Sequence, residues 1–80
     1  MISNYRPSNK YPKNWNRLRF YIFKRDHFRC QRCGIQCDGI TPDRKPVCHH
    51  KIPIDCGGTH HPINLITVCS RCHKIIHGYI

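Results

Sequence analysis

Acidic side chains are almost missing from this chain of 80 residues. It contains no glutamate and only four aspartates, against 14 lysines and arginines, so its formal net charge is +10. Basic charge kept only for solubility is a weak explanation, because mixed signs would serve solubility as well. The electric field of such a small basic body attracts polyanions, and nucleic acid is therefore the partner that we expect.

Long apolar runs are missing as well. No stretch is long and apolar enough to span a membrane, and the first ten residues, MISNYRPSNK, contain no apolar run of the kind that a signal peptide needs. A chain of this length forms one domain with a small core, and such a core usually needs a metal, disulfides or a partner subunit for stability.

Cysteines, in contrast, are plentiful. There are seven, and four of them form two Cys-x-x-Cys pairs, Cys30 with Cys33 and Cys69 with Cys72. The odd count and the paired spacing favour zinc thiolates in a reducing compartment over a secreted disulfide framework. One pair alone could be a redox site, but two pairs favour a single tetrahedral zinc ion on all four sulfurs, with Gly34 supplying the positive φ that a zinc knuckle needs. The other three cysteines have no matched spacing and are interpreted as small apolar fillers or incidental thiols: Cys37, Cys48 and Cys56.

The composition divides the chain into two parts. Residues 1–13 carry two prolines and several basic residues among Asn, Ser and Tyr, so they bury little and are predicted to form an extended basic arm. That composition suits an arm that contacts phosphates and a frayed terminus equally well. Residues 14–80 are predicted to form the single folded domain.

A helix is predicted from Trp15 to about Arg25. Asn14 precedes it and can act as its N-cap. Trp15, Leu18 and Ile22 fall at i, i+3 and i+7, so the pattern predicts one buried stripe along the helix.

The C-terminal half predicts a strand–loop–strand–helix unit. Residues 47–52 and 64–68 have the character of short strands, and Pro53 and two glycines end the first of them. A helix is predicted from residue 69 to about 77, where Gly78 is placed to end it. Residues 35–46 hold turn signals and predict a loop.

Six of the seven histidines lie between residues 47 and 77. His73 and His77 are four apart on the predicted helix, so both imidazoles project from one face, as two helical ligands of one metal ion must. His49 and His50 are neighbours on a predicted strand and point to opposite faces, so one can bind a metal while the other has another function. Two simpler interpretations are that these are surface histidines or that His73 joins the structural zinc. Either would explain a lone histidine better than it explains these four. The remaining two are assigned to the loop without a catalytic role: His60 and His61.

These motifs, in this order and at these distances, resemble the HNH endonucleases, which are the His-Me finger or ββα-metal nucleases, in the variety with a four-cysteine zinc site. The resemblance covers residues 15–78 and is carried by Cys30-x2-Cys33, His49-His50-Lys-Ile-Pro53, Gly57-Gly58, Asn64-Leu65 and Cys69-x2-Cys72-His73-x3-His77. It implies a small, metal-stabilised α+β fold with an N-terminal helix, a zinc knuckle and a ββα-metal core. It also implies a metal-dependent DNA endonuclease that leaves 5′-phosphate and 3′-hydroxyl ends.

The resemblance further implies a role for each matched residue. His50 matches the general base, and Asn64 matches the asparagine that orients it. His49 and His73 match ligands of a catalytic divalent ion, and His77 matches a further ligand that some members lack. That ion can be Mg²⁺, Mn²⁺, Ni²⁺ or Zn²⁺, and an all-imidazole set leans toward the transition metals. The four cysteines match a structural Zn²⁺ site.

Basic residues around the first helix, the knuckle and the expected active site are predicted to contact DNA phosphates without reading bases. They are Arg17, Arg19, Lys24, Arg25, Arg29, Arg32, Lys51, Arg71 and Lys74. A homodimer and a phage or bacterial partner protein both stay open. The chain is similar in size to the stand-alone HNH proteins of bacteriophages and bacteria. We therefore expect it in the cytoplasm of a bacterial or phage-infected cell.

Two other functions fit parts of the sequence. A non-catalytic zinc module that binds nucleic acid would need the four cysteines but neither His50 nor Asn64. A redox or zinc-storage protein would need none of the histidines. The chain contains the four cysteines together with the histidines and Asn64, and this combination favours the endonuclease.

Overall fold

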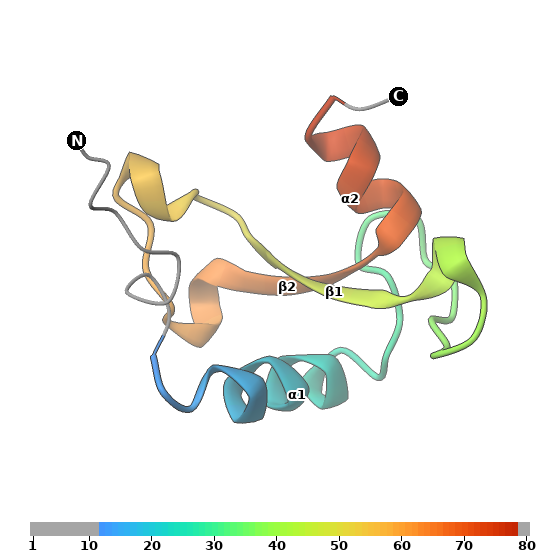
Figure 1. Cartoon of the computed structure of the whole chain (residues 1–80), viewed down its shortest axis with the longest axis horizontal. Coiled ribbons are helices and arrows are strands. Elements are labelled where there is room, and N and C mark those ends of the chain that lie inside the picture. Colours follow the sequence, from blue (N-terminus) through green and yellow to red (C-terminus); the bar gives the residue numbers. More distant parts are fainter. Residues whose placement is uncertain (1–11, 79–80) are drawn as a thin grey trace.

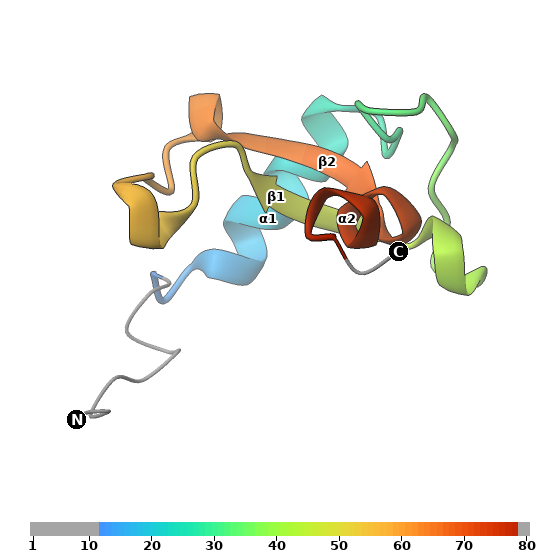
Figure 2. The same ribbon diagram turned by 90° about the horizontal axis from the view of Figure 1, so that it is seen from above.

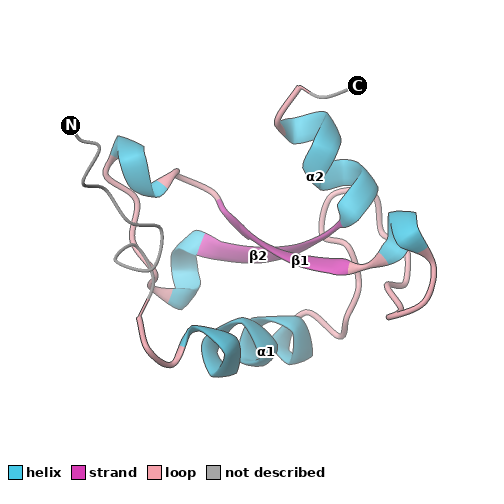
Figure 3. Ribbon diagram, in the orientation of Figure 1, coloured by secondary structure: helices cyan, strands magenta, loops and turns pink. Residues whose placement is uncertain are grey.

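The computed structural model describes residues 12–78, so nearly all of the predicted arm at residues 1–13 lies outside the described part. Among the described residues, no helix has the length and apolar character needed to cross a membrane. The predicted small α+β fold with its cysteine cluster is confirmed. Its elements are α1 (Trp15–Arg25), β1 (Pro46–His50), β2 (Leu65–Cys69) and α2 (Ser70–Ile76), with single 3-10 turns at Pro42–Arg44, Ile54–Cys56 and Pro62–Asn64 (Figure 3).

A two-stranded antiparallel sheet forms the middle layer of the molecule. β1 and β2 pair from Pro46 opposite Cys69 to His50 opposite Leu65. α1 lies on one face of this sheet and α2 lies on the other (Figures 1 and 2). Because successive side chains on a strand point to opposite faces, the two neighbouring histidines of β1 are directed toward different helices.

The observed strands are shifted from the predicted ranges 47–52 and 64–68 by one or two residues. β1 ends at His50 because the backbone amide of Ile52 donates to the side-chain oxygen of Asn64, at 2.9 Å, instead of continuing the ladder of backbone bonds. β2 extends to Cys69, which is also the N-cap residue of α2 and accepts from the backbone amide of Cys72. Gly78, with a φ of 77°, follows the end of α2 as predicted.

α1 has its predicted bounds, but the predicted buried stripe is wrong in part. Ile22 and Phe23 are buried, whereas Trp15 and Leu18 are only half-buried. Phe23 is covered because the chain turns back after α1, where the amide of Phe28 donates to the Phe23 carbonyl at 2.8 Å and the two ring centroids lie 6.0 Å apart. Asn14 occupies the N-cap position, but its side chain makes no capping hydrogen bond.

Asp26, directly after α1, fastens this helix to β2. Its carboxylate accepts from the backbone amide of Thr67 at 2.9 Å and from Nε and Nη2 of Arg25 at 2.9 and 3.0 Å. Arg25 also donates to the carbonyls of Pro62 and Leu65, so one guanidinium holds the start of β2 against α1. Burial alone would raise the pKa of Asp26, but the bonds from Arg25 and Thr67 outweigh it and lower that pKa.

We expect Asp26→Ala to lower the free energy of unfolding by about 1–3 kcal/mol at neutral pH, because it leaves the Thr67 amide without its acceptor and Arg25 without its counterion. Asp43→Ala is the control, since Asp43 is exposed and lies on a surface turn. Urea unfolding of the zinc-loaded proteins measures both. Equal losses for the two variants would contradict this account of how α1 is attached.

Candidate active site

The four paired cysteines come together at one end of the sheet. The sulfur atoms of Cys30, Cys33, Cys69 and Cys72 all lie within 4.8 Å of one another, and those of Cys33 and Cys69 are 3.9 Å apart. A zinc ion about 2.3 Å from four tetrahedral sulfurs would space them about 3.8 Å apart, so the cluster has the dimensions of a zinc site. The backbone amide of Gln31 donates to the carbonyl of Thr67 at 2.9 Å, which joins the knuckle to β2.

Hydrogen bonds to the sulfurs favour the thiolate form at part of this cluster. The backbone amides of Cys33 and Arg32 donate to the Cys30 sulfur at 3.3 and 3.4 Å. Burial would raise the pKa of Cys30, yet these and other backbone bonds lower it to about 6. Burial raises the pKa of Cys72 to about 12, although Nη1 of Arg32 lies 3.5 Å from its sulfur. Four thiolates this close together would need a cation to balance them, and this donor set suits zinc.

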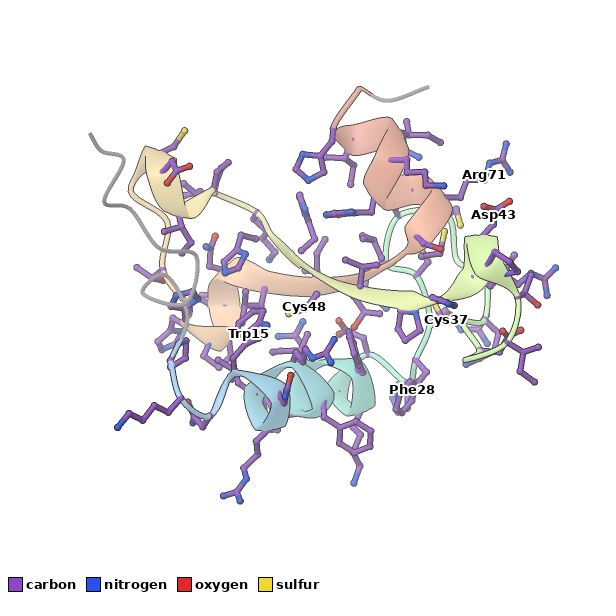
Figure 4. The ribbon with its side chains drawn as sticks, in the orientation of Figure 1. Trp15, Phe28, Cys37, Asp43, Cys48 and Arg71 are labelled. Carbon is purple, nitrogen blue, oxygen red and sulfur yellow. The ribbon has the colours of Figure 1, made fainter. Side chains whose placement is uncertain are left out.

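The other three cysteines lie outside this cluster, and all seven are free thiols. Cys37 is packed in the core beside the cluster, where burial raises its pKa to about 11. Cys48 lies between β1 and α1 (Figure 4), and burial raises its pKa to about 11 too. Cys56 is exposed. The positions of Cys37 and Cys48 agree with their interpretation as small apolar fillers.

Three histidines form a second cluster, between β1 and α2. Ring nitrogens of His49, His73 and His77 lie within 4.8 Å of one another, and the Nε2 atoms of His73 and His77 are 3.0 Å apart. Two nitrogens about 2.1 Å from one ion would lie about 3.0 Å apart in octahedral geometry and about 3.4 Å apart in tetrahedral geometry, so this spacing also suits a shared metal. Burial, and then the charge of His77, lower the pKa values of His49 and His73. These shifts favour the neutral form of both rings, which is the form that a metal ligand needs.

A cleft of about 560 Å³ runs past this cluster along the edge of β1 that does not pair with β2. Because it follows a strand edge, it reaches side chains on both faces of the sheet. His73 lines it from α2 and His77 from the C-cap position that follows α2. His49 and His50 line it from β1, and Trp15 and Arg19 from α1. The two histidine neighbours of β1 thus face different helices and still border the same cleft.

His50 is held between two aromatic rings. The Trp15 ring stacks on it with a centroid distance of 5.5 Å and an interplanar angle of 8°, and Nδ1 of His60 lies 3.1 Å from its Nε2. The rings of Trp15 and His60 also meet edge to face, at 5.4 Å. No sequence pattern indicates this group, because its members come from a helix, a strand and a loop; the prediction for Trp15 was burial in the core.

Asn64 is buried and clamps the loop that follows His50. Its side-chain amide donates to the carbonyls of Ile52 and Thr59 at 3.0 and 2.8 Å, while its oxygen accepts from the amide of Ile52. The loop closes so tightly that a Cβ on Gly58 would lie 1.8 Å from the Ile52 carbonyl oxygen, and only glycine fits there. Asn64 thereby sets where the loop carrying His60 returns to the sheet.

The family model described as HNH endonuclease matches residues 30–78. This chain belongs to the HNH endonuclease family. The match contains both cysteine pairs, the three clustered histidines, His50 and Asn64, and it indicates nuclease-type activity on nucleic acid. No curated protein and no solved structure matches the chain. α1 lies outside the matched residues, so Trp15 and Arg19 are contributions of this HNH protein's own N-terminal helix to the cleft.

Eight of the nine basic residues predicted to contact nucleic acid fall into two groups in this HNH protein. Three of them bond within the chain: Arg25 as described above, Arg29 to the carbonyl of Gly34 at 2.7 Å, and Arg32 to the Cys72 sulfur. The other five are exposed, and Arg71 projects outward from α2 (Figure 4); they are Arg17, Lys24, Lys51, Arg71 and Lys74. Arg19 is the ninth, and it lines the cleft, which none of the other eight does.

Proposed function

We propose that this HNH protein is a metal-dependent DNA endonuclease that hydrolyses phosphodiester bonds. The observation that carries the proposal is one cleft in which three histidines with metal-site spacing lie beside a separately held histidine, His50. A module that only binds nucleic acid would need neither the cluster of three histidines nor the separately held His50. The basic composition and the absence of glutamate agree with a polyanionic substrate.

His49, His73 and His77 are the residues that would hold the catalytic ion. A bound divalent cation supplies charge neutralisation at the scissile phosphate and stabilises the leaving oxygen. All three ligands are imidazoles, and this set favours transition metals over Mg²⁺. Because the three histidines come from β1 and from the α2 segment, a bound ion would also tie these two parts together.

His50 is the proposed general base. Its imidazole accepts a proton from water, the water oxygen forms a bond to phosphorus, and the bond between phosphorus and the 3′ oxygen breaks. The 3′ oxygen then takes up a proton, so the products are a 5′-phosphate and a 3′-hydroxyl. An imidazole suits this task near neutral pH because its reference pKa is about 6.5.

Trp15, His60 and Asn64 are positioning residues for His50 in this proposal. The stacked Trp15 ring restricts rotation of the imidazole plane, and the contact from His60 Nδ1 restricts where its Nε2 points. Asn64 holds the loop that presents His60. A base held in one orientation lowers the entropy that must be lost on the way to the transition state.

The exposed basic residues are proposed to hold the DNA by its phosphates. Arg17, Lys24, Lys51, Arg71 and Lys74 are available for this, and Arg19 reaches into the cleft itself. Phosphate contacts release counterions, so binding weakens steeply as salt is raised. Arg25, Arg29 and Arg32 contribute less, because their donors bond within the chain.

The test of this function is cleavage of supercoiled plasmid by the zinc-loaded protein, with EDTA or with added Mg²⁺, Mn²⁺, Ni²⁺ or Zn²⁺. We expect no cleavage in EDTA and conversion to nicked or linear DNA with at least one metal, with 5′-phosphate and 3′-hydroxyl ends on the products. Ends that carry a 3′-phosphate would contradict the mechanism. A protein that shifts the plasmid on a gel and cuts it with none of the metals would instead be a non-catalytic nucleic-acid-binding module.

A further inference from the structure

A second groove, outside the proposed active site, lies between α1 and the segment that leads into β1. Its floor consists of three phenylalanines: Phe23 is buried, Phe28 packs on it, and the Phe20 ring meets Phe28 edge to face at 5.7 Å. The groove measures about 430 Å³. Phe28 lies beside the C-terminal end of α1 in Figure 4. Phe20 is 53% exposed, so a large aromatic face of this small domain is open to a partner.

The rim of this phenylalanine groove is cationic. Arg19 and Lys45 border it, and none of the residues lining it, all within the described part of the chain, is acidic. Lys24 adds a further positive charge, with its Nζ 5.8 Å from the centroid of the Phe20 ring. An apolar peptide would gain nothing from this rim, whereas an aromatic group attached to a phosphate would contact both the floor and the rim.

The phenylalanine groove is also continuous with the cleft of the proposed active site. Arg19 and Pro46 line both. A strand of nucleic acid whose scissile phosphate lies at the cluster of three histidines can therefore pass over Arg19 and reach the phenylalanines. The floor suits only a base that has left its stack, because a paired duplex turns phosphates and sugars outward and keeps its base faces covered.

We propose that the phenylalanine groove binds an unpaired base of the DNA next to the cleavage site, so that DNA with an unpaired nucleotide is the preferred substrate. This inference rests on the proposed function for the identity of the ligand as DNA. Phe20 stacks on the base, while Arg19 and Lys45 contact the adjoining phosphates. Stacking on an aromatic side chain tolerates any base, so the preference is for DNA structure and not for sequence.

The experiment compares two short labelled DNAs, a fully paired duplex and the same duplex with one unpaired nucleotide in its middle. Fluorescence anisotropy with zinc-loaded protein, without other added divalent metal, measures binding independently of cutting. We expect the wild type to bind the DNA with the unpaired nucleotide about tenfold more tightly. Phe20→Ala removes this preference and Phe20→Trp keeps it. Tyr21→Ala is the matched control, because Tyr21 is an equally exposed aromatic residue of α1, at 56%, and does not line the groove.

Equal binding of the two DNAs by the wild type would overturn the proposal. So would a Phe20→Ala variant that weakens binding of both DNAs to the same extent, since that result describes a duplex contact or a damaged fold. If the protein cuts plasmid and shows no preference between the two DNAs, the groove proposal is overturned and the proposed function is retained. If the protein shows the Phe20-dependent preference but cuts no DNA with any metal, the groove proposal is supported and the nuclease function is overturned.

Discussion

Replacing His50 by alanine is expected to lower the rate of plasmid cleavage by about 10²- to 10⁴-fold, because that is the usual contribution of a general base. The fold is expected to survive. His50 is the last residue of β1, is only half-buried, and pairs with β2 through its backbone, which the substitution retains. Single-turnover cleavage in the best metal measures the loss, and circular dichroism together with zinc content measures the fold.

His61→Ala is the control for His50→Ala. His61 is exposed in the neighbouring loop, where its Nδ1 accepts from the amide of Ile63, and it does not line the cleft. We expect its cleavage rate to stay close to that of the wild type. A folded His50→Ala protein that still cuts at the wild-type rate would exclude His50 as the base, and the three clustered histidines would then need another partner for the water.

Loss of the ion from the four-cysteine site is expected to unfold the domain. The core beneath α2 is built largely from sulfur, since Cys30, Cys37, Cys69 and Cys72 are buried there with Val68. The apparent free energy of binding a structural zinc is about 10–16 kcal/mol, which equals or exceeds the whole stability of a typical domain. Either a strong chelator or Cys69→Ser should therefore abolish the cooperative thermal transition at neutral pH.

Cys56→Ser is the matched control, because Cys56 is an exposed thiol outside the cluster. It should retain both the thermal transition and one tightly bound zinc per chain. His73→Ala should also retain that zinc, since its ring belongs to the other cluster. A metal-free protein with an unchanged melting temperature would contradict a structural role for the site.

Short spacings along the chain account for the features that could be predicted. Two residues in a Cys-x-x-Cys pair, or two histidines four apart on a helix, are brought close by local backbone geometry alone. The structure accordingly brings Cys30 to Cys33, and His73 to His77. The bounds of α1 follow from a local pattern in the same way. The end of β1 does not, because it depends on the Ile52 amide, which donates to the side-chain oxygen of Asn64 instead of continuing the ladder.

Contacts between distant segments could not be predicted in this way. Trp15 has the periodicity of a core residue, and only the packing of α1 across β1 brings it against His50. As a basic residue, Arg25 was predicted to contact phosphates. In the folded chain, its guanidinium instead donates to Asp26 and to the carbonyl at the start of β2. The phenylalanine groove likewise depends on the turn that folds Phe28 back over Phe23.

The amino-acid sequence by itself determined the family and the members of the cysteine and histidine clusters, and it predicted a polyanionic partner, because those depend on residue types at short separations and on net charge. Tertiary structure decided which side chains border the cleft, which arginines remain available to nucleic acid, and where an aromatic surface stays open. The physical reason is that burial and charge pairing act between elements whose relative placement no local pattern encodes.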